Sequence, residues 1–108
     1  MFKIVKIEDS FVVFLIAKNG QIILKSKGFS TKAAAAENNV ESIKKNSFYD
    51  ERFEKLETKY GYYYFLLKAT NGQVIGKSQN YASIASRDNG TESVKKNAYS
   101  EKIDYELS

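Results

Sequence analysis

The stretch Asn19-Gly20-Gln21-Ile22-Ile23 decides the fold of this chain, because it occurs twice: it returns as Asn71-Gly72-Gln73-Val74-Ile75. A second stretch, Glu41-Ser42-Ile43-Lys44-Lys45-Asn46, returns as Glu92-Ser93-Val94-Lys95-Lys96-Asn97. The copies lie 52 residues apart at the first block (71 − 19) and 51 at the second (97 − 46), so one residue was gained or lost in between. A period of this length indicates a duplicated structural unit.

The duplicated units are too small to be separate domains. The chain has 108 residues, the length of one ordinary domain. Half of it is about the size at which a hydrophobic core barely outweighs chain entropy. We therefore expect a single domain over residues 1–108, made of two intertwined repeats that share one core. Repeat one covers about 1–51 and repeat two about 52–108.

Asn-Gly between two apolar stretches is a strong local signal for a β-hairpin, because both residues tolerate the positive φ angles of a two-residue type I′ turn. Such turns predict strand pairs at Phe11–Lys18 with Gln21–Ser26 and at Tyr62–Thr70 with Gln73–Ser78. The resulting register pairs Ala17 with Ile22, Leu15 with Leu24, Phe14 with Lys25, Ala69 with Val74, Leu67 with Gly76, and Leu66 with Lys77.

Further strands are predicted by alternating runs at Phe2–Val5, Phe53–Leu56 and Ile103–Leu107. The strand at Phe53 follows the helix of the first copy and opens the second copy, so we expect it to belong to both. The run at Ile103 closes the chain.

A helix follows each hairpin, with Thr31 and Ser83 as the expected N-caps. The predicted inward stripes are Ala36, Val40 and Ile43 in the first helix and Ala85, Thr91 and Val94 in the second. Gly90 costs the second helix about 1 kcal/mol relative to Ala, which indicates a close approach to the sheet. Both helices end on Lys-Lys-Asn, where cations suit the helix dipole and Asn tolerates a left-handed terminal residue.

These motifs together resemble the YegP-like family, small bacterial proteins of unknown function. The frame is Asn-Gly-Gln-(Val/Ile)-Ile-x-x-Ser, an aromatic residue, a Ser or Thr that opens an Ala-rich helix, and Asn-Gly-x-Glu-Ser-Val-Lys-Lys-Asn-Ala. Residues 53–98 carry nearly the whole match. The first copy departs from it, with Asn39 in place of the helix Gly, Ser47 in place of the Ala, and one extra residue near Ala36.

The resemblance implies an α+β fold: two tandem β-β-β-α repeats plus a closing strand in one antiparallel sheet, with both helices on one face. It also implies a pseudo-twofold relation and exchanged C-terminal strands. It implies no reaction, cofactor or catalytic residue.

Composition narrows the function classes. The chain has no Cys and no His, which removes thiol chemistry, thiolate metal sites, the commonest metal ligand and the usual general base. We therefore predict no enzyme, no cofactor and no metal site. No apolar run is long enough for a signal peptide or a membrane span, so a soluble, cytoplasmic protein without a membrane partner is expected.

The sheet face away from the helices is expected to be unusually apolar. A half-solvated antiparallel sheet normally keeps this outer face polar, and large exposed apolar patches mark interaction sites. The alternative is that these residues only reflect β-propensity, or that Phe14 and Ile16 instead face the helix. The predicted interaction surface consists of Val12, Phe14, Ile16, Ile23, Tyr62, Tyr64, Leu66 and Ile75.

Two kinds of partner are compatible with these residues. The preferred prediction is a small binding module whose outer sheet face contacts a second copy, as a homodimer, or an unknown protein. The alternative is weak binding of single-stranded nucleic acid, because lysines beside aromatic residues contact phosphates and bases. The lysines predicted for that role are Lys25, Lys68, Lys77, Lys44, Lys45, Lys95 and Lys96; the mild net charge of +4 permits such a partner without requiring one.

Overall fold

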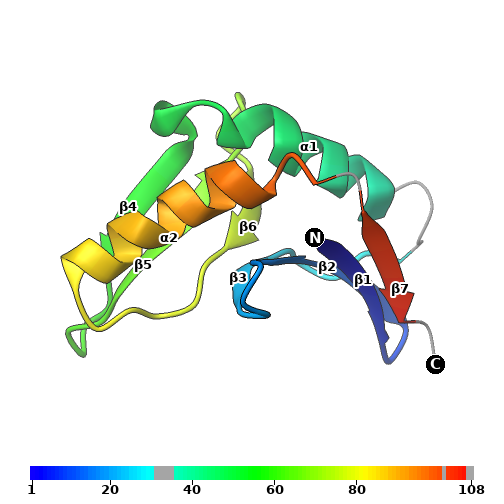
Figure 1. The fold of residues 1–108 in the computed structure, drawn as a ribbon, viewed down its shortest axis with the longest axis horizontal. Helices are drawn as coiled ribbons and strands as arrows, with labels where there is room; N and C mark the ends of the chain where they lie inside the picture. Colours follow the sequence, from blue (N-terminus) through cyan, green and yellow to red (C-terminus); the bar gives the residue numbers. More distant parts are fainter. Residues whose placement is uncertain (31–35, 101, 107–108) are drawn as a thin grey trace.

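The computed structural model describes residues 1–30, 36–100 and 102–106. The first repeat consists of β1 (Phe2–Ile7), β2 (Ser10–Ile16), β3 (Ile22–Lys25) and α1 (Glu37–Ser47). After a one-turn 3-10 helix, η2 (Asp50–Arg52), the second repeat consists of β4 (Phe53–Glu57), β5 (Tyr63–Lys68), β6 (Val74–Lys77), α2 (Ile84–Asn97) and β7 (Ile103–Glu106). Both helices lie above one continuous sheet (Figure 1), as expected for the α+β fold.

The strand order in the sheet is β4-β5-β6-β3-β2-β1-β7, so the two repeats meet at its centre. All neighbours pair antiparallel except β7, which runs parallel to β1 with Ile103 opposite Phe2. The sheet is therefore mixed, which corrects the expectation of a wholly antiparallel one. The chain leaves α2 at the end of the sheet where β1 begins, and the Phe2 N–H donates to the Lys102 carbonyl at 3.0 Å. Two strands that start side by side must run in the same direction.

Two elements of the second repeat, α2 and β7, pack against strands of the first repeat. The last strand of repeat two lies against β1 of repeat one, and α2 contacts β2 and β3 as well as β5. The α1 helix in turn packs on β5 and β6 of the second repeat. The strand at Phe53, which was expected to belong to both repeats, follows α1 and η2 in the chain and pairs with β5 of the second repeat.

The Asn-Gly hairpins differ from the predicted turn. The Gly20 N–H donates to the Ala17 carbonyl, the Ala17 N–H donates to the Gln21 carbonyl, and Gly20 has a φ of 84°. This is a three-residue loop with a bulge at glycine, and Gly72 repeats it. A two-residue type I′ turn needs positive φ at both central residues, whereas this loop needs it only at Gly. Asn19 instead accepts a hydrogen bond from the Gln21 N–H through its side chain, at 3.0 Å.

Because the loop has one residue more than predicted, the pairing of β2 with β3 differs from the predicted register by one residue between Leu15 and the loop. Leu24 lies opposite Leu15 and Lys25 opposite Phe14 as predicted, but Ile16 instead of Ala17 lies opposite Ile22. Ile23 is the extra residue of a bulge. The second hairpin has the same irregularity, with Lys68 instead of Ala69 opposite Val74.

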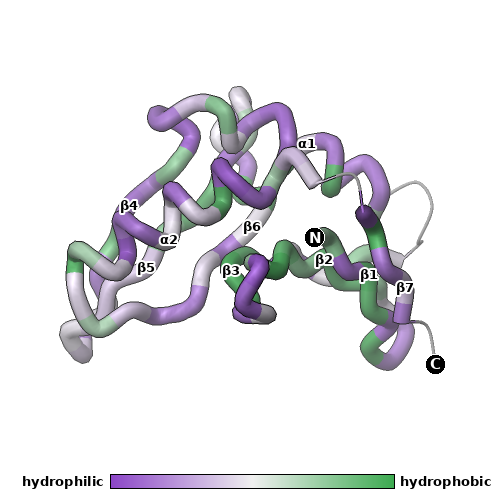
Figure 2. Tube along the Cα trace, in the orientation of Figure 1, coloured by the Kyte–Doolittle hydropathy of each residue, from purple (hydrophilic) through white to green (hydrophobic). Residues whose placement is uncertain are grey.

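The core lies between the helices and the inner face of the sheet. Val13, Leu15, Phe65 and Leu67 are completely buried, which excludes the alternative that Phe14 and Ile16 face the helices. Many of the hydrophobic residues of the chain lie in β1, β2 and β3 (Figure 2). The core also contains Phe2, Ile4, Ile23, Leu24, Ala36, Val40, Ile43, Val94 and Ala98, so it draws on both repeats.

The predicted helix stripes are confirmed with one exception. Thr91 and Val94 are buried, but Ala85 is exposed. The first turn of α2 lies at the β4–β5 end of the sheet (Figure 1). Ser83 caps α2 by accepting from the Ser86 N–H, as predicted. The expected cap Thr31 lies outside the described residues.

The Asn of each Lys-Lys-Asn triplet has a role that the sequence did not indicate. Neither helix ends in a left-handed residue, since both C-cap residues have right-handed helical φ and ψ. The side-chain amides of Asn46 and Asn97 donate instead to the carbonyls of Ser42 and Ser93, each at 2.8 Å. The repeated Asn therefore bonds to the preceding turn of its own helix.

Candidate functional site

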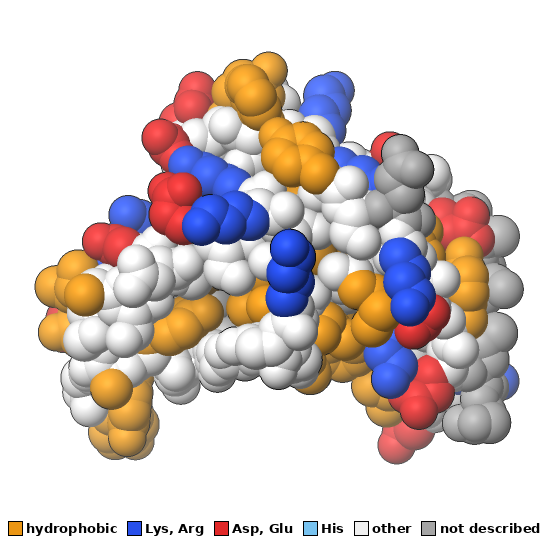
Figure 3. All heavy atoms as spheres, viewed as in Figure 1, with side chains coloured by type: hydrophobic (Ala, Val, Ile, Leu, Met, Phe, Trp, Pro, Cys, Tyr) orange, Lys and Arg blue, Asp and Glu red, His pale blue; other side chains and the backbone are white. Residues whose placement is uncertain are grey.

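A groove opens at the centre of the outer sheet face, where the two repeats meet. β3 and β6 are paired at a single position, Lys25 opposite Lys77, and the space between them has a volume of about 900 Å³. The lower outline of the molecule is arched, with the β4–β5 hairpin on one side and the β1–β2 hairpin on the other (Figures 1 and 3). The lining residues are Phe14, Gly20, Gln21, Ile22, Leu24, Lys25, Ser26, Lys27, Val74, Ile75, Gly76, Lys77, Ser78 and Gln79.

The exposed apolar walls of the groove are Ile22 and Val74. Their exposed fractions are 46% and 43%, and they occupy equivalent positions in the two repeats. Sequence reasoning missed both, because the bulge brings Ile22 and Val74 onto the face expected for their neighbours. Ile23 is only 3% exposed and belongs to the core, while Ile75 is half-buried against it. Recognising the three-residue Asn-Gly loop would have given this register.

The other residues of the predicted interaction surface differ in accessibility. Phe14, Ile16, Tyr64 and Leu66 are half-buried on the outer face. Tyr62 is more open, with 48% of its surface exposed. Val12 offers little surface, since it lies opposite Val5 and is 6% exposed. Of the eight residues, Phe14 and Ile75 line the groove itself.

The lysines at the groove have aromatic neighbours in place of carboxylates. Lys25 Nζ lies 5.9 Å from the centre of the Phe14 ring, and Lys77 Nζ lies 5.0 Å from that of Tyr64. Lys27 Nζ similarly lies 5.6 Å from the Phe29 ring. Among the ion pairs of the described residues, none involves these three lysines.

Charges on the flanking strands are paired instead. Lys68 contacts Glu54 at 2.7 Å, and Lys3 contacts Glu106 at 3.5 Å. The positive charge of the outer face is consequently concentrated at its centre, along the line where β3 meets β6.

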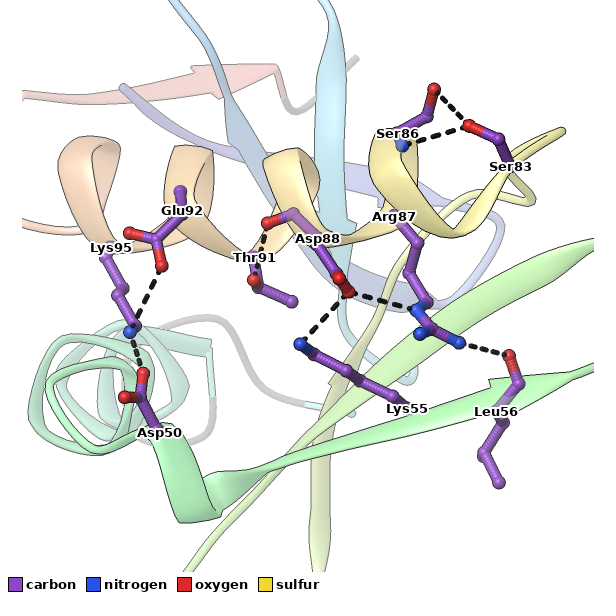
Figure 4. Close-up of polar contacts among 10 residues, drawn as sticks. All are labelled: Asp50, Lys55, Leu56, Ser83, Ser86, Arg87, Asp88, Thr91, Glu92 and Lys95. Atoms are coloured by element: carbon purple, nitrogen blue, oxygen red, sulfur yellow. Dashed lines mark hydrogen bonds and ion pairs between the residues drawn. The ribbon is translucent and has the colours of Figure 1, made fainter.

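The remaining lysines predicted for nucleic-acid binding lie on the helices. Lys44 forms an ion pair with Glu41, and Lys95 contacts both Asp50 and Glu92 (Figure 4). Lys45 and Lys96 are exposed near the ends of α1 and α2. The helices cover the inner face, so the seven lysines divide between two sides of the molecule and do not form one surface (Figure 1).

A polar network ties α2 to β4 on the helix side (Figure 4). Lys55 Nζ lies 3.0 Å from an Asp88 carboxylate oxygen, and Arg87 Nε lies 3.4 Å from the same oxygen. The hydrogen bond from Lys55 lowers the pKa of Asp88 below its usual value, and Arg87 adds to the effect. Arg87 also donates to the Leu56 carbonyl at 3.4 Å. These contacts join α2 to β4.

The described residues offer little to a metal ion. Within 1–30, 36–100 and 102–106, no three Asp or Glu side chains gather closely enough to form a candidate site. In the same part of the chain, no helix has the length and apolar character needed to span a membrane.

The chain belongs to the DUF1508 family, a domain of unknown function whose model matches residues 8–54 and again residues 59–104. It is 50% identical over 97 residues to the UPF0339 protein ACIAD0721 of Acinetobacter baylyi, covering 89% of this chain and 86% of the relative. It is 42% identical over 96 residues to the UPF0339 protein YegP of Escherichia coli, with the same coverage of 89% and 86%. The expected YegP-like family and the tandem repeat are thus confirmed.

Solved structures of relatives have the same fold. The solution NMR structure of YegP from Escherichia coli, a protein of unknown function, matches with a TM-score of 0.92 and 40% identity over 99% of this chain and 92% of that one. The solution NMR structure of the UPF0339 protein SO3888 from Shewanella oneidensis matches with a TM-score of 0.91 and 38% identity, over 98% and 90% of the two chains. These relatives establish the family without assigning it a reaction or a partner.

Proposed function

We propose that this chain is a non-enzymatic binding module that receives a partner protein on the outer face of its sheet. The observation that carries the proposal is the groove between β3 and β6, which lies at the centre of that face and exposes Ile22 and Val74. Binding sites are concave, mostly apolar and fitted with a few polar groups, and exposed apolar surface favours association. We place this activity in the bacterial cytoplasm.

A different protein suits this face better than a second copy. Lys25 and Lys77 lie opposite each other where the repeats meet, close to their pseudo-twofold axis. A symmetric dimer that packs the centres of two outer faces against each other would bring the same lysines of two chains together, and like charges in contact oppose association. Light scattering is therefore expected to give a monomer of 12.3 kDa.

The proposal is tested with a photo-crosslinking amino acid placed at Ile22 or at Val74, in the full chain and in its native cells. The matched control carries the same group at Lys45, which is exposed on the helix side. A discrete adduct with another protein is expected from both groove positions and not from the control. Adducts with a second copy would show self-association instead, and the lack of any groove-specific adduct would refute the module.

Weak binding of single-stranded nucleic acid is the second candidate, favoured by Lys25, Lys68 and Lys77 on the same face as Tyr64. It predicts that a labelled deoxythymidine oligonucleotide is retained at low salt and released steeply as salt rises. Two contacts reduce this potential: Lys68 is paired with Glu54, and Lys77 lies over the Tyr64 ring on which a base would stack. Unchanged oligonucleotide anisotropy at low salt would exclude it.

A further inference from the structure

We infer that the groove takes an acidic peptide segment of the partner protein, with a carboxylate held between Lys25 and Lys77 and apolar side chains against Ile22 and Val74. This inference rests on the proposed function and names the chemistry that the partner presents. Its three supports are the central lysine pair, the apolar walls and the distances between them.

The lysine pair is the first support. Lys25 and Lys77 are directly opposite across the β3–β6 junction, and like charges at directly opposed positions of a sheet repel each other. No described carboxylate forms an ion pair with either side chain, although Lys3 and Lys68 on the flanking strands each have one. A carboxylate brought by a partner would relieve the repulsion and gain two charged hydrogen bonds.

The walls of the groove decide what accompanies the carboxylate. Ile22 and Val74 are aliphatic and nearly half exposed, and the contiguous lining surface is mainly apolar. Nucleic-acid bases stack on aromatic faces, but Phe14, the aromatic residue among the described residues that line the groove, lies beside the Lys25 ammonium. Aliphatic walls around a cationic centre fit apolar side chains on either side of an Asp or Glu.

The geometry of the strands gives the spacing. Ile22 precedes Lys25 and Val74 precedes Lys77 by three residues, but the bulge makes each of these segments span only two residues of the neighbouring strand. Each apolar wall therefore lies about 7 Å along its strand from the lysine pair, at about 3.3 Å per residue. Because β3 and β6 are antiparallel, the two walls lie on opposite sides of the pair. An extended peptide would therefore place apolar residues about two positions before and after its carboxylate.

The test begins with an unbiased selection. A phage-displayed library of random twelve-residue peptides is selected on the full chain, and enriched peptides are synthesised and measured by fluorescence anisotropy. We expect the enriched sequences to share an Asp or Glu with apolar residues on both sides. No enrichment, or enrichment of sequences without an acidic residue, would overturn the inference.

Charge reversal in the groove tests the contact itself. Lys25→Glu with Lys77→Glu should weaken the selected peptides by at least about tenfold, because attraction becomes repulsion. The matched control is Lys45→Glu with Lys96→Glu, another repeat-related pair, which should stay within about twofold. Equal thermal midpoints for the two variants exclude misfolding. Peptides with Lys in place of the acidic residue should regain binding to the groove variant, and binding that ignores these exchanges would overturn the inference.

The two proposals fail in different ways. If the crosslinker at position 22 or 74 captures a protein in cells but the selected peptides are neutral, the inference of an acidic peptide is wrong and the proposed binding module remains. If an oligonucleotide competes for the groove and the peptides do not bind, the partner class is wrong. If neither cross-linking nor selection gives a result at the groove, both proposals fall.

Discussion

The two repeats are alike in their local hydrogen bonds and differ where they pack against each other. In each, a serine hydroxyl closes the end of the hairpin: Ser26 accepts from the Val13 N–H at 2.8 Å, and Ser78 accepts from the Phe65 N–H at 2.9 Å. The central position of the inner face, by contrast, is Leu24 in one repeat and Gly76 in the other. A Cβ at Gly76 would lie 2.7 Å from Leu24 side-chain atoms. Leucine at both positions would collide near the pseudo-twofold axis.

The two helices also differ from each other at a position where they pack against the rest of the molecule. Gly90 allows α2 to approach Tyr81, since a Cβ there would clash with the tyrosine hydroxyl. The equivalent residues of repeat one are Asn39 and Phe29. Asn39 is 7% exposed and donates to the Ile75 carbonyl of the other repeat at 3.2 Å. The repeats therefore keep the hydrogen bonds of their hairpins and differ at this helix position, where Asn39 contacts the other repeat and Gly90 packs on Tyr81 of its own repeat.

Separating the repeats should have the largest effect. The segment 1–51 lacks β7, which pairs with β1, and it also lacks α2, which packs on β2 and β3. We expect this segment to show no cooperative thermal unfolding by circular dichroism, while the full chain unfolds in one transition. A compact monomer of residues 1–51 with a sharp melt would mean that the repeats are independent, contrary to the shared core.

Exchanging the residues at the axis should have the next largest effect. Leu24→Gly leaves a cavity and should lower the free energy of unfolding by about 3–5 kcal/mol, and Gly76→Leu should cost about 3 kcal/mol through overpacking. The double exchange places one leucine and one glycine at the axis again. The double variant should lose about 1–3 kcal/mol less free energy of unfolding than the sum of the two single variants, as measured by urea unfolding. A loss equal to that sum would show that these residues do not compensate each other.

Gly90→Ala should have a smaller effect, about 1–2 kcal/mol of destabilisation, because crowding against Tyr81 exceeds the helix-propensity gain of about 1 kcal/mol. Adding Tyr81→Phe removes the closest atom and should restore part of the lost stability. It also makes position 81 the same as Phe29, its equivalent in repeat one. Thermal unfolding of the two variants measures the difference. Stabilisation by Gly90→Ala alone would contradict the close approach.

The smallest effect is expected at Asp88, on the helix side of repeat two. Lys55→Met removes the main cause of its lowered pKa, so the pKa should rise toward 3.8, as measured by NMR titration of the carboxylate. The sign follows from linkage: a lowered pKa in the folded state favours folding above the unfolded pKa, and this contribution is lost as pH falls through the folded value. An unchanged pKa in Lys55→Met would mean that Arg87 alone holds the carboxylate.

Much of the fold was predictable because its signals are local. The duplicated Asn-Gly blocks predicted the hairpins, and the apolar alternation identified Val13, Leu15, Phe65 and Leu67 as inward-facing. Gly90 indicated the close approach that Tyr81 makes. The candidate site was less accessible to sequence reasoning, since one extra loop residue shifts the outward positions to Ile22 and Val74.

The sequence by itself determined the repeats, the strand and helix types and the inner face, since turn chemistry and side-chain periodicity act between residues close together in the chain. Only the tertiary structure decided that β7 runs parallel to β1, that Leu24 fills the space over Gly76, and that a groove centred on Lys25 and Lys77 opens between the repeats. Each of these depends on how one repeat lies against the other. That arrangement arises from contacts between residues about fifty positions apart, which no local pattern specifies.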